Sequence, residues 1–363
     1  MNMRSTVSLH FTVFLALFCA GMLTPKVEAA PVTVREALNQ SDTWFRSDEG
    51  RTALDHVLSH QSIHGDWPKN QNSTAKRFSG ERKSIKGTFD NGATTGELRL
   101  LARALAATND ARYRAAFLKG LEHILAAQYT NGGWPQYSPP PTKSYHRHIT
   151  FNDDSMRRLL EFLRDVVSAK SFEFVPLEKR EAAKLSFDRG IDCILKCQVR
   201  VAGRLTVWCA QHDEVTLEPR PARTFELASL SGSESAGLLL LLMSLEQPSP
   251  AVICAVHAGA RWYQTNKLAG IRELRVDGDK KIVRDATAPA LWARFYEIDT
   301  GRPIFSGRDG VRKYDYAEIE KERRNGYSWY GTRGTEVLVK YESWRQGRPE
   351  NPSAPAAESS KNK

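Results

Sequence analysis

The sequence has few cysteines, no long apolar stretch after its first thirty residues, and few segments in which apolar and polar residues alternate. Five cysteines among 363 residues exclude a small fold that depends on disulfides. Cys193 and Cys197 stand one helical turn apart, and no second ligand pair follows at a suitable spacing, which disfavours a structural zinc site. Alternation is confined to short runs such as RLTVW (204–208), which disfavours a β-rich fold.

The first 29 residues have the features of an export signal. Arg4 gives a basic start, an apolar stretch follows, and VEAA (27–30) offers small residues for cleavage. We therefore predict a signal peptide over residues 1–29 and a secreted or periplasmic protein. The apolar stretch is too short for a spanning helix, so we expect no membrane partner. One domain is predicted over residues 30–345, followed by a disordered tail over 346–363, which is rich in Pro, Ala, Ser and Lys.

The formal net charge of +10 indicates a polyanionic partner. Acidic polysaccharide, nucleic acid and an anionic membrane surface all fit that charge. No nucleic-acid-binding motif accompanies it, and the predicted export also argues against nucleic acid. We expect the protein to be a monomer.

Three segments share one plan, an apolar helix end followed by Gln, a Gly-containing turn and Trp. They are HVLSHQSIHGDWPKN (56–70), HILAAQYTNGGWPQY (123–137) and CILKCQVRVAGRLTVWCAQ (193–211). A fourth segment, 260–270, keeps the helix end and the Gln but lacks the later Trp. The four glutamines are 67, 70 and 66 residues apart, which predicts a repeated structural unit of that size.

Each unit contains a second helical pattern, over 93–107, 154–169, 233–247 and 288–298. Apolar residues recur there at helical spacing with charged residues between them. Repeated helix pairs are typical of an α-solenoid or of a closed α/α toroid. Because the period exceeds that of common solenoids, we predict a mainly α fold, an α/α toroid with long loops and little β structure.

Polar residues precede these second helices in FDNGA (89–93), ITFNDD (149–154), LSGSE (230–234) and RDATAP (284–289). If the pairs are equivalent, these loops share one rim of the toroid. Asp153 or Asp154 could simply cap its helix. One acid is enough for a cap, however, and Asn152 with both acids supplies more oxygen ligands than a cap needs. Asp90 and Asn91, on the same rim, would add further oxygen ligands. A calcium site is therefore also plausible. It is not an EF-hand, because the required loop pattern is missing.

Three arginines stand among aromatic or turn-forming residues, namely Arg223, Arg294 and Arg308. Taken alone, each has an ordinary role as a solvated or ion-paired side chain. Together they suit carboxylate ligands, which the guanidinium fork binds through two hydrogen bonds. Among the aromatic residues, Tyr327, Trp329 and Tyr330 are candidates for stacking on sugar rings, whereas packing better explains the repeated Trp67, Trp134 and Trp208.

Several of these motifs occur together and in order, including FDNGATTGELRLLARA, NGGWPQY, HITFNDDSM, ARTFELASLSGSES, APALWARFYEI and RDG…NGYSWYGT. Over residues 35–340 the sequence resembles the family-ten pectate lyases, calcium-dependent α/α-toroid enzymes that cleave polygalacturonate by β-elimination. The stretch near Arg333, in YGTRG, departs from the resemblance because an aromatic residue would be expected there.

The resemblance implies roles for particular residues. Arg308 in GRDG matches the arginine that acts as Brønsted base, and an alkaline optimum would follow. Arg223 and Arg294 match arginines that hold substrate carboxylates, to which we add Asn91 and Tyr327 as substrate-binding residues. Asp90 and Asp153 match acids at the Ca²⁺ and substrate centre, and the adjacent Asp154 is either a further metal ligand or only the helix cap.

Two other functions use the same residues. A non-catalytic protein that binds acidic polysaccharide would need the calcium and the arginines, but it would need no catalytic base. A toroidal glycoside hydrolase would use two carboxylic acids, for which Asp90, Asp153 and Glu234 are available. Only a lyase forms a C4–C5 double bond, whose ultraviolet absorbance distinguishes the reactions.

Overall fold

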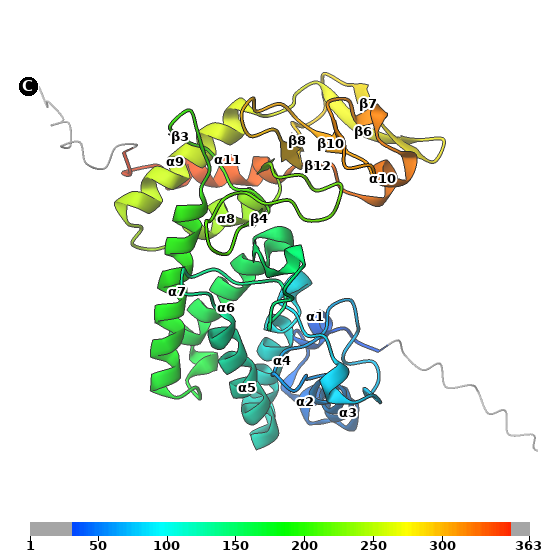
Figure 1. Ribbon diagram of the computed structural model, residues 1–363. Coiled ribbons are helices and arrows are strands. Elements are labelled where there is room, and N and C mark those ends of the chain that lie inside the picture. Colours follow the sequence, from blue (N-terminus) through cyan, green and yellow to red (C-terminus); the bar gives the residue numbers. More distant parts are fainter. Residues whose placement is uncertain (1–30, 350–363) are drawn as a thin grey trace, which may run out of the picture. The chain divides into compact units, whose positions relative to one another are not determined.

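The structure is a computed structural model that describes residues 31–349, and residues 32–349 belong to one compact unit (Figure 1). The predicted signal peptide and most of the predicted tail lie outside the described residues. Short helices α1 (Val34–Ala37), α2 (Asp42–Arg46) and α3 (Asp48–Ser59) come first. Within the described part of the chain, no helix is long and apolar enough to cross a membrane.

Three helix pairs follow and confirm the mainly helical fold. They are α4 (Thr95–Thr108) with α5 (Ala111–Ala127), α6 (Ser155–Ser168) with α7 (Leu177–Cys197), and α8 (Glu234–Met243) with α9 (Pro250–Thr265). The first members pack in the order α4, α6, α8, and the last of these packs on α11 (Arg333–Trp344). The second members pack in the order α5, α7, α9. Two parallel rows of helices result, and closure of these rows into a toroid stays a prediction.

Over residues 31–349, every sheet is a two-stranded antiparallel pair, and a few isolated β-bridges occur besides. The longest is the hairpin of β6 (Ile271–Val276) and β7 (Asp279–Arg284), beside α10 (Lys321–Gly326). The remaining pairs join two-residue strands: β1 (Ile149–Thr150) with β4 (Gln211–His212), β2 (Arg200–Val201) with β3 (Arg204–Leu205), β5 (Leu230–Ser231) with β9 (Phe295–Tyr296), β8 (Trp292–Ala293) with β12 (Tyr330–Gly331), and β10 (Phe305–Ser306) with β11 (Arg312–Lys313).

The repeated glutamines connect one helix pair to the next. The Nε2 of Gln61, after α3, donates to the carbonyls of Gly65 at 2.9 Å and of Ala116 in α5 at 2.8 Å. Gln128, after α5, repeats this with Gly132 and α7, and Gln198, after α7, repeats it with Thr206 and α9. In each case one side-chain amide donates two hydrogen bonds, one to the following turn and one to the neighbouring helix. This double role explains why Gln recurs at these positions.

The repeated tryptophans are buried packing residues, as predicted. The indole N–H groups of Trp67, Trp134 and Trp208 each donate to a carbonyl of the preceding helix, at 2.7–2.9 Å. Trp292 makes the same bond to the carbonyl of Tyr263 at 2.9 Å. Trp292, which lies beyond the segment 260–270, is therefore the equivalent tryptophan of the fourth unit.

The helix predicted over residues 288–298 is wrong. The segment is extended and contributes β8 and β9, and its residues Trp292, Ala293, Phe295 and Tyr296 are buried. Its backbone pairs with two other segments, β12 and β5, so hydrogen bonds to distant parts of the chain outweigh its helical spacing.

Helix α4 begins with a buried carboxyl group that will titrate near neutral pH. Glu97 accepts hydrogen bonds from the backbone N–H of Thr94 at 2.9 Å and from the Ser73 hydroxyl at 3.1 Å. Burial disfavours the carboxylate and raises the pKa of Glu97 to about 7. The native state therefore binds this proton more tightly than the unfolded chain does.

We expect the free energy of unfolding to fall as the pH rises from about 4.5 to about 7, by roughly 3 kcal/mol from this group, because ionisation of Glu97 is costly only in the native state. Glu97→Gln, which keeps an acceptor for Thr94 and needs no ionisation, should remove that slope. Urea unfolding at pH 5 and pH 8 measures it, with the exposed Glu49→Gln as the control. An unchanged slope in Glu97→Gln would contradict the assignment.

Candidate active site

Three of the polar loops meet, as the repeat predicted. The 3₁₀ turns η2 (Asp90–Gly92) and η4 (Asn152–Asp154) precede α4 and α6, and η4 packs on both η2 and α8. Asn91, Asp153 and Asp154 have positive φ values of 55°, 51° and 60°, a conformation that Asn and Asp tolerate best. The fourth loop is not joined to them in this way, since Asp285 pairs with Arg272 of the β6–β7 hairpin.

Neither acid caps helix α6, so the capping interpretation is wrong. Asp154 occupies the N-cap position, but its side chain accepts no hydrogen bond from the helix backbone. Both of its oxygens instead accept from Nη2 of Arg333, at 3.0 and 2.9 Å. Arg333 also donates to the carbonyl of Ser233 at 3.0 Å. Arg333, the residue at which the sequence departs from the family resemblance, therefore binds Asp154. Through its second bond to Ser233, it connects the start of α6 to the loop before α8.

Arg294 joins the second and third loops. Its Nη2 lies 2.5 Å from the Oε1 of Glu234, 3.2 Å from the Oδ1 of Asn152 and 3.3 Å from the Oδ1 of Asp153. The Arg294 side chain is only 10% exposed and that of Glu234 only 1%. Burial alone would lower the pKa of Arg294, but the charge of Glu234 and other anionic groups raise it overall. Arg294 is therefore held in place and charged.

Tyr327 connects Arg294 to Arg223. The guanidinium carbons of these arginines lie 4.8 Å and 5.4 Å from the centre of its ring. Its hydroxyl donates to Glu226 at 2.6 Å, and Glu226 also binds Arg223 at 2.8 and 2.5 Å. Tyr327 thus positions the guanidinium groups of both arginines. Trp329, another residue predicted to stack on sugar rings, is fully buried and packs inside the protein instead.

The two arginines differ in accessibility. The Arg223 side chain is 45% exposed, whereas Arg294 is nearly buried. Hydrogen bonding to Glu226 raises the pKa of Arg223, so this guanidinium is charged in the ligand-free protein. Burial acts against ionisation of Glu226, but its bonds to Arg223 and Tyr327 lower its pKa overall. Arg223 is therefore the more accessible of the two to a carboxylate ligand, and Arg294 is held in place by the acids around it.

Asp90 is a buried carboxylate with one oxygen in use. Its Oδ2 forms an ion pair with Lys69 and accepts a hydrogen bond from Gln136 at 2.5 Å. Its Oδ1 is buried and has no hydrogen-bond partner among the described residues. The next residue, Asn91, is exposed and donates to Asn70 at 3.2 Å. A buried carboxylate oxygen without a donor fits a cation ligand.

The predicted metal ligands Asp90, Asp153 and Asp154 do not converge as one cluster. Over residues 31–349, the only group of three metal-ligating side chains with donor atoms within 4.8 Å is His148, Asp213 and Glu214. Arg220 pairs with Asp213, and Arg147 pairs with Glu214. That cluster is acidic and could hold a metal, but nearby guanidinium groups already neutralise it.

Among the described residues, Arg308 does not pair with the acids that bind Arg223 and Arg294. Its side chain is 65% exposed and pairs with Glu322, with Nη2–Oε1 and Nε–Oε2 distances of 3.1 and 3.2 Å. Glu322 pairs in turn with Arg323, whose guanidinium lies over the ring of Phe225. The assignment of Arg308 as the base stays a prediction.

Sequence reasoning missed Lys69, Gln136 and Glu226. Glu226 follows Arg223 by three residues in ARTFE, and that spacing alone could have indicated an ion pair. Lys69 and Gln136 belong to the turns WPKN and WPQ that follow two of the repeated tryptophans. Each stands two residues after its Trp, so the repeat indicates that the two positions are equivalent, but their contacts with Asp90 are seen only in the structure.

Comparison with known proteins gives a consistent result. Residues 61–338 match the family described as pectic acid lyase. A mutant of a family 10 polysaccharide lyase from Cellvibrio cellulosa, solved in complex with trigalacturonic acid, is 34% identical, with a TM-score of 0.75 over 86% of this chain and 99% of that one. Another structure of a family 10 polysaccharide lyase from the same organism is 34% identical, with a TM-score of 0.73 over 87% and 99%. No curated protein sequence matches the chain.

The match covers most of the chain, and the structural similarity extends over nearly the whole of each relative. Shared sequence at this level supports more than a common fold, because the matched region includes every residue of the site described above. The chain belongs to the pectic acid lyases, polysaccharide lyase family 10.

Proposed function

We propose that the protein cleaves α-1,4-polygalacturonate by calcium-dependent β-elimination and releases 4,5-unsaturated oligogalacturonates. The observation that carries this proposal is the pairing of Arg223 and Arg294 on the ring of Tyr327, beside the loops of Asp90 and Asp153. Two fixed guanidinium groups suit a substrate with a carboxylate on every sugar. The relative solved with trigalacturonic acid supports the same substrate class.

The reaction removes the C5 proton of a galacturonate and expels the O4 leaving group. The C5 proton is α to a carboxylate and poorly acidic while the negative charge of that carboxylate is unopposed. A bound Ca²⁺ supplies positive charge that stabilises the carbanion-like transition state. Asp90 and Asp153 are the residues that would hold this ion, since Asp90 has a free buried oxygen and Asp153 is partly exposed. Asp154 is occupied by Arg333.

An arginine is proposed as the base, and Arg223 competes with the predicted Arg308 for this role. Arg223 is half-exposed and lies at the ring that also contacts Arg294, whereas Arg308 faces Glu322. Glu226 favours the charged form of Arg223, but a base must first be deprotonated. Deprotonation of Arg223 therefore requires either that substrate binding weaken its pair with Glu226 or that the pH be high. An alkaline optimum is therefore still expected.

The alternatives fit the geometry less well. A glycoside hydrolase needs one protonated and one ionised carboxyl group at the scissile bond. Asp90, Asp153 and Glu234 are instead paired with Lys69 or Arg294, and Glu234 is buried. A protein that only binds acidic polysaccharide would show no turnover at all.

The proposal is tested with polygalacturonate and the mature protein. We expect ultraviolet absorbance from the unsaturated product, formed faster at alkaline pH. New reducing ends without this absorbance would indicate hydrolysis, and binding without either product would indicate a non-catalytic protein. Recovery of activity from the culture medium or periplasmic fraction, and the elution volume on gel filtration, test the proposed export and monomeric state.

A further inference from the structure

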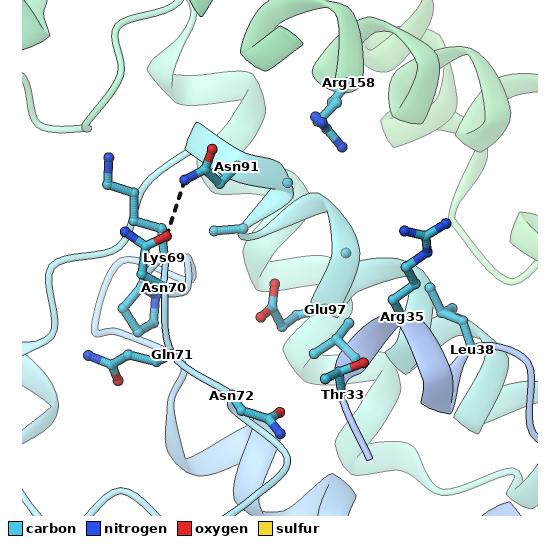
Figure 2. A pocket seen from close by; sticks show the side chains of 15 residues that line it. Thr33, Arg35, Leu38, Lys69, Asn70, Gln71, Asn72, Asn91, Glu97 and Arg158 are labelled. Atoms are coloured by element: carbon cyan, nitrogen blue, oxygen red, sulfur yellow. Dashed lines mark hydrogen bonds between the residues drawn. The ribbon is translucent and has the colours of Figure 1, made fainter. Parts of the chain in front are cut away.

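A pocket with several charged side chains in its wall lies beside turn η2. It has a volume of about 550 Å³ and is formed by the segment after Trp67, by α1, by the start of α4 and by one residue of α6. Its polar lining includes Arg35, Lys69, Gln71, Asn91 and Arg158. Figure 2 shows Arg158 and Arg35 projecting from different helices toward this space. Three cationic side chains therefore line one pocket.

Two of these cations are not paired with acids. Over residues 31–349, no ion pair or side-chain hydrogen bond involves the guanidinium groups of Arg35 or Arg158, and both residues are exposed. The acid in the pocket wall, Glu97, is buried and bonded to Thr94 and Ser73. Two unpaired guanidinium groups that face one pocket suit an anionic ligand, because a guanidinium binds a carboxylate through two hydrogen bonds.

Two residues connect the pocket to the candidate active site. Lys69 lines the pocket and also pairs with Asp90. Asn91, which follows Asp90 in the same turn, lines the pocket as well. A second pocket of about 370 Å³ shares Pro68–Gln71 with it and adds Lys86 and Tyr137. Both pockets therefore lie beside Lys69, the residue that pairs with Asp90.

We propose that this pocket is a distal subsite that binds the carboxylate of a galacturonate residue remote from the bond that is cleaved. The inference rests on the proposed function, because it takes the polysaccharide as the ligand. Arg35 and Arg158 supply the guanidinium donors for the carboxylate, and the amide of Gln71 and the oxygen of Asn91 suit sugar hydroxyl groups. The subsite adds binding only for chains long enough to reach it.

The test compares long polygalacturonate with trigalacturonate, using the double variant Arg35→Gln/Arg158→Gln. For polygalacturonate we expect KM to rise about three- to tenfold with kcat unchanged, in the range for exposed charge interactions that act together. The increase should shrink at high ionic strength because exposed charges are screened. For trigalacturonate, both constants should match those of the wild type. The control is Arg51→Gln, which removes an equally exposed arginine of α3 that does not line the pocket.

Three results would overturn the subsite. They are an unchanged KM on polygalacturonate at low salt, an equal rise of KM on trigalacturonate, and an equal rise in Arg51→Gln. Failure of the proposed function is recognised separately, because wild-type protein would then form no unsaturated product. In that case retention of wild-type and double-variant protein on immobilised polygalacturonate still tests the pocket, and equal retention would reject it.

Discussion

Arg223→Ala should lower the turnover of polygalacturonate by about 10²-fold or more, the lower range for removal of a positioned general base. Arg223 is the half-exposed guanidinium at the Tyr327 ring, so its loss removes both a carboxylate contact and the candidate base. Arg308→Ala is the comparison that decides between the two assignments. The sequence assignment predicts the large loss at Arg308, whereas the geometry predicts it at Arg223.

The Arg223 experiment needs a control for the charge left behind. Glu226 is buried, and in Arg223→Ala its carboxylate would keep two neutral donors, the backbone N–H of residue 223 and the Tyr327 hydroxyl, but no opposite charge, so the variant could lose activity through misfolding. The double variant Arg223→Ala/Glu226→Gln removes that charge. If it melts like the wild type and is still inactive, the loss belongs to the reaction. Activity restored in the double variant would assign Arg223 a structural role only.

The pH dependence separates a base from a substrate-binding residue. Glu226→Gln removes the hydrogen-bonded anion that raises the pKa of Arg223, and it leaves Arg223 in place. With the pKa lowered, the deprotonated form is populated at lower pH. If Arg223 is the base, the alkaline rise of the rate should shift to lower pH in this variant. If the pH–rate profile of Glu226→Gln only decreases in height and does not shift, Arg223 binds a substrate carboxylate and is not the base.

Periodicity predicted the helix pairs because their buried faces are formed by residues close in sequence. The buried leucines of α6, Leu159, Leu160 and Leu163, show this directly, and the repeated Gln and Trp fix the turn after the second helix of a pair. Residues 288–298 have a similar spacing but pair with β12 and β5, which lie far away in sequence. No local pattern reports such pairing, so the prediction failed there.

The candidate site was predicted as a set of residues but not as a set of contacts. Asp90 and Asp153 do lie on neighbouring loops, because equivalent loops of a repeat meet at one side of the packed helices. Arg294 reaches Asp153 from the segment between β8 and β9, and the ring of Tyr327 connects Arg294 to Arg223. Which acid pairs with which cation depends on side chains from three or four segments. Arg333 binding Asp154 is an example, since the two residues are 179 positions apart.

Asp90→Asn should weaken the activation of the enzyme by calcium by about 10²-fold, because even residues outside the ligand shell of a metal typically cost 10- to 100-fold in affinity. Asparagine keeps the shape of the side chain and an acceptor for Lys69, so the fold should be preserved. It removes the negative charge on the buried oxygen that has no other partner. Rates measured over a calcium titration, and calcium binding measured by calorimetry without substrate, report the effect.

The matched control is Asp188→Asn, which alters another Lys–Asp pair, with Lys184, on the exposed face of α7. That variant should respond to calcium like the wild type, and excess chelator should stop turnover in both until calcium is restored. Full wild-type activity in chelator would exclude an exchangeable calcium. Identical calcium responses of Asp90→Asn and the wild type would remove Asp90 from the metal site. In that case its unpartnered oxygen would require another explanation, such as a buried water bound beside Lys69 and Gln136.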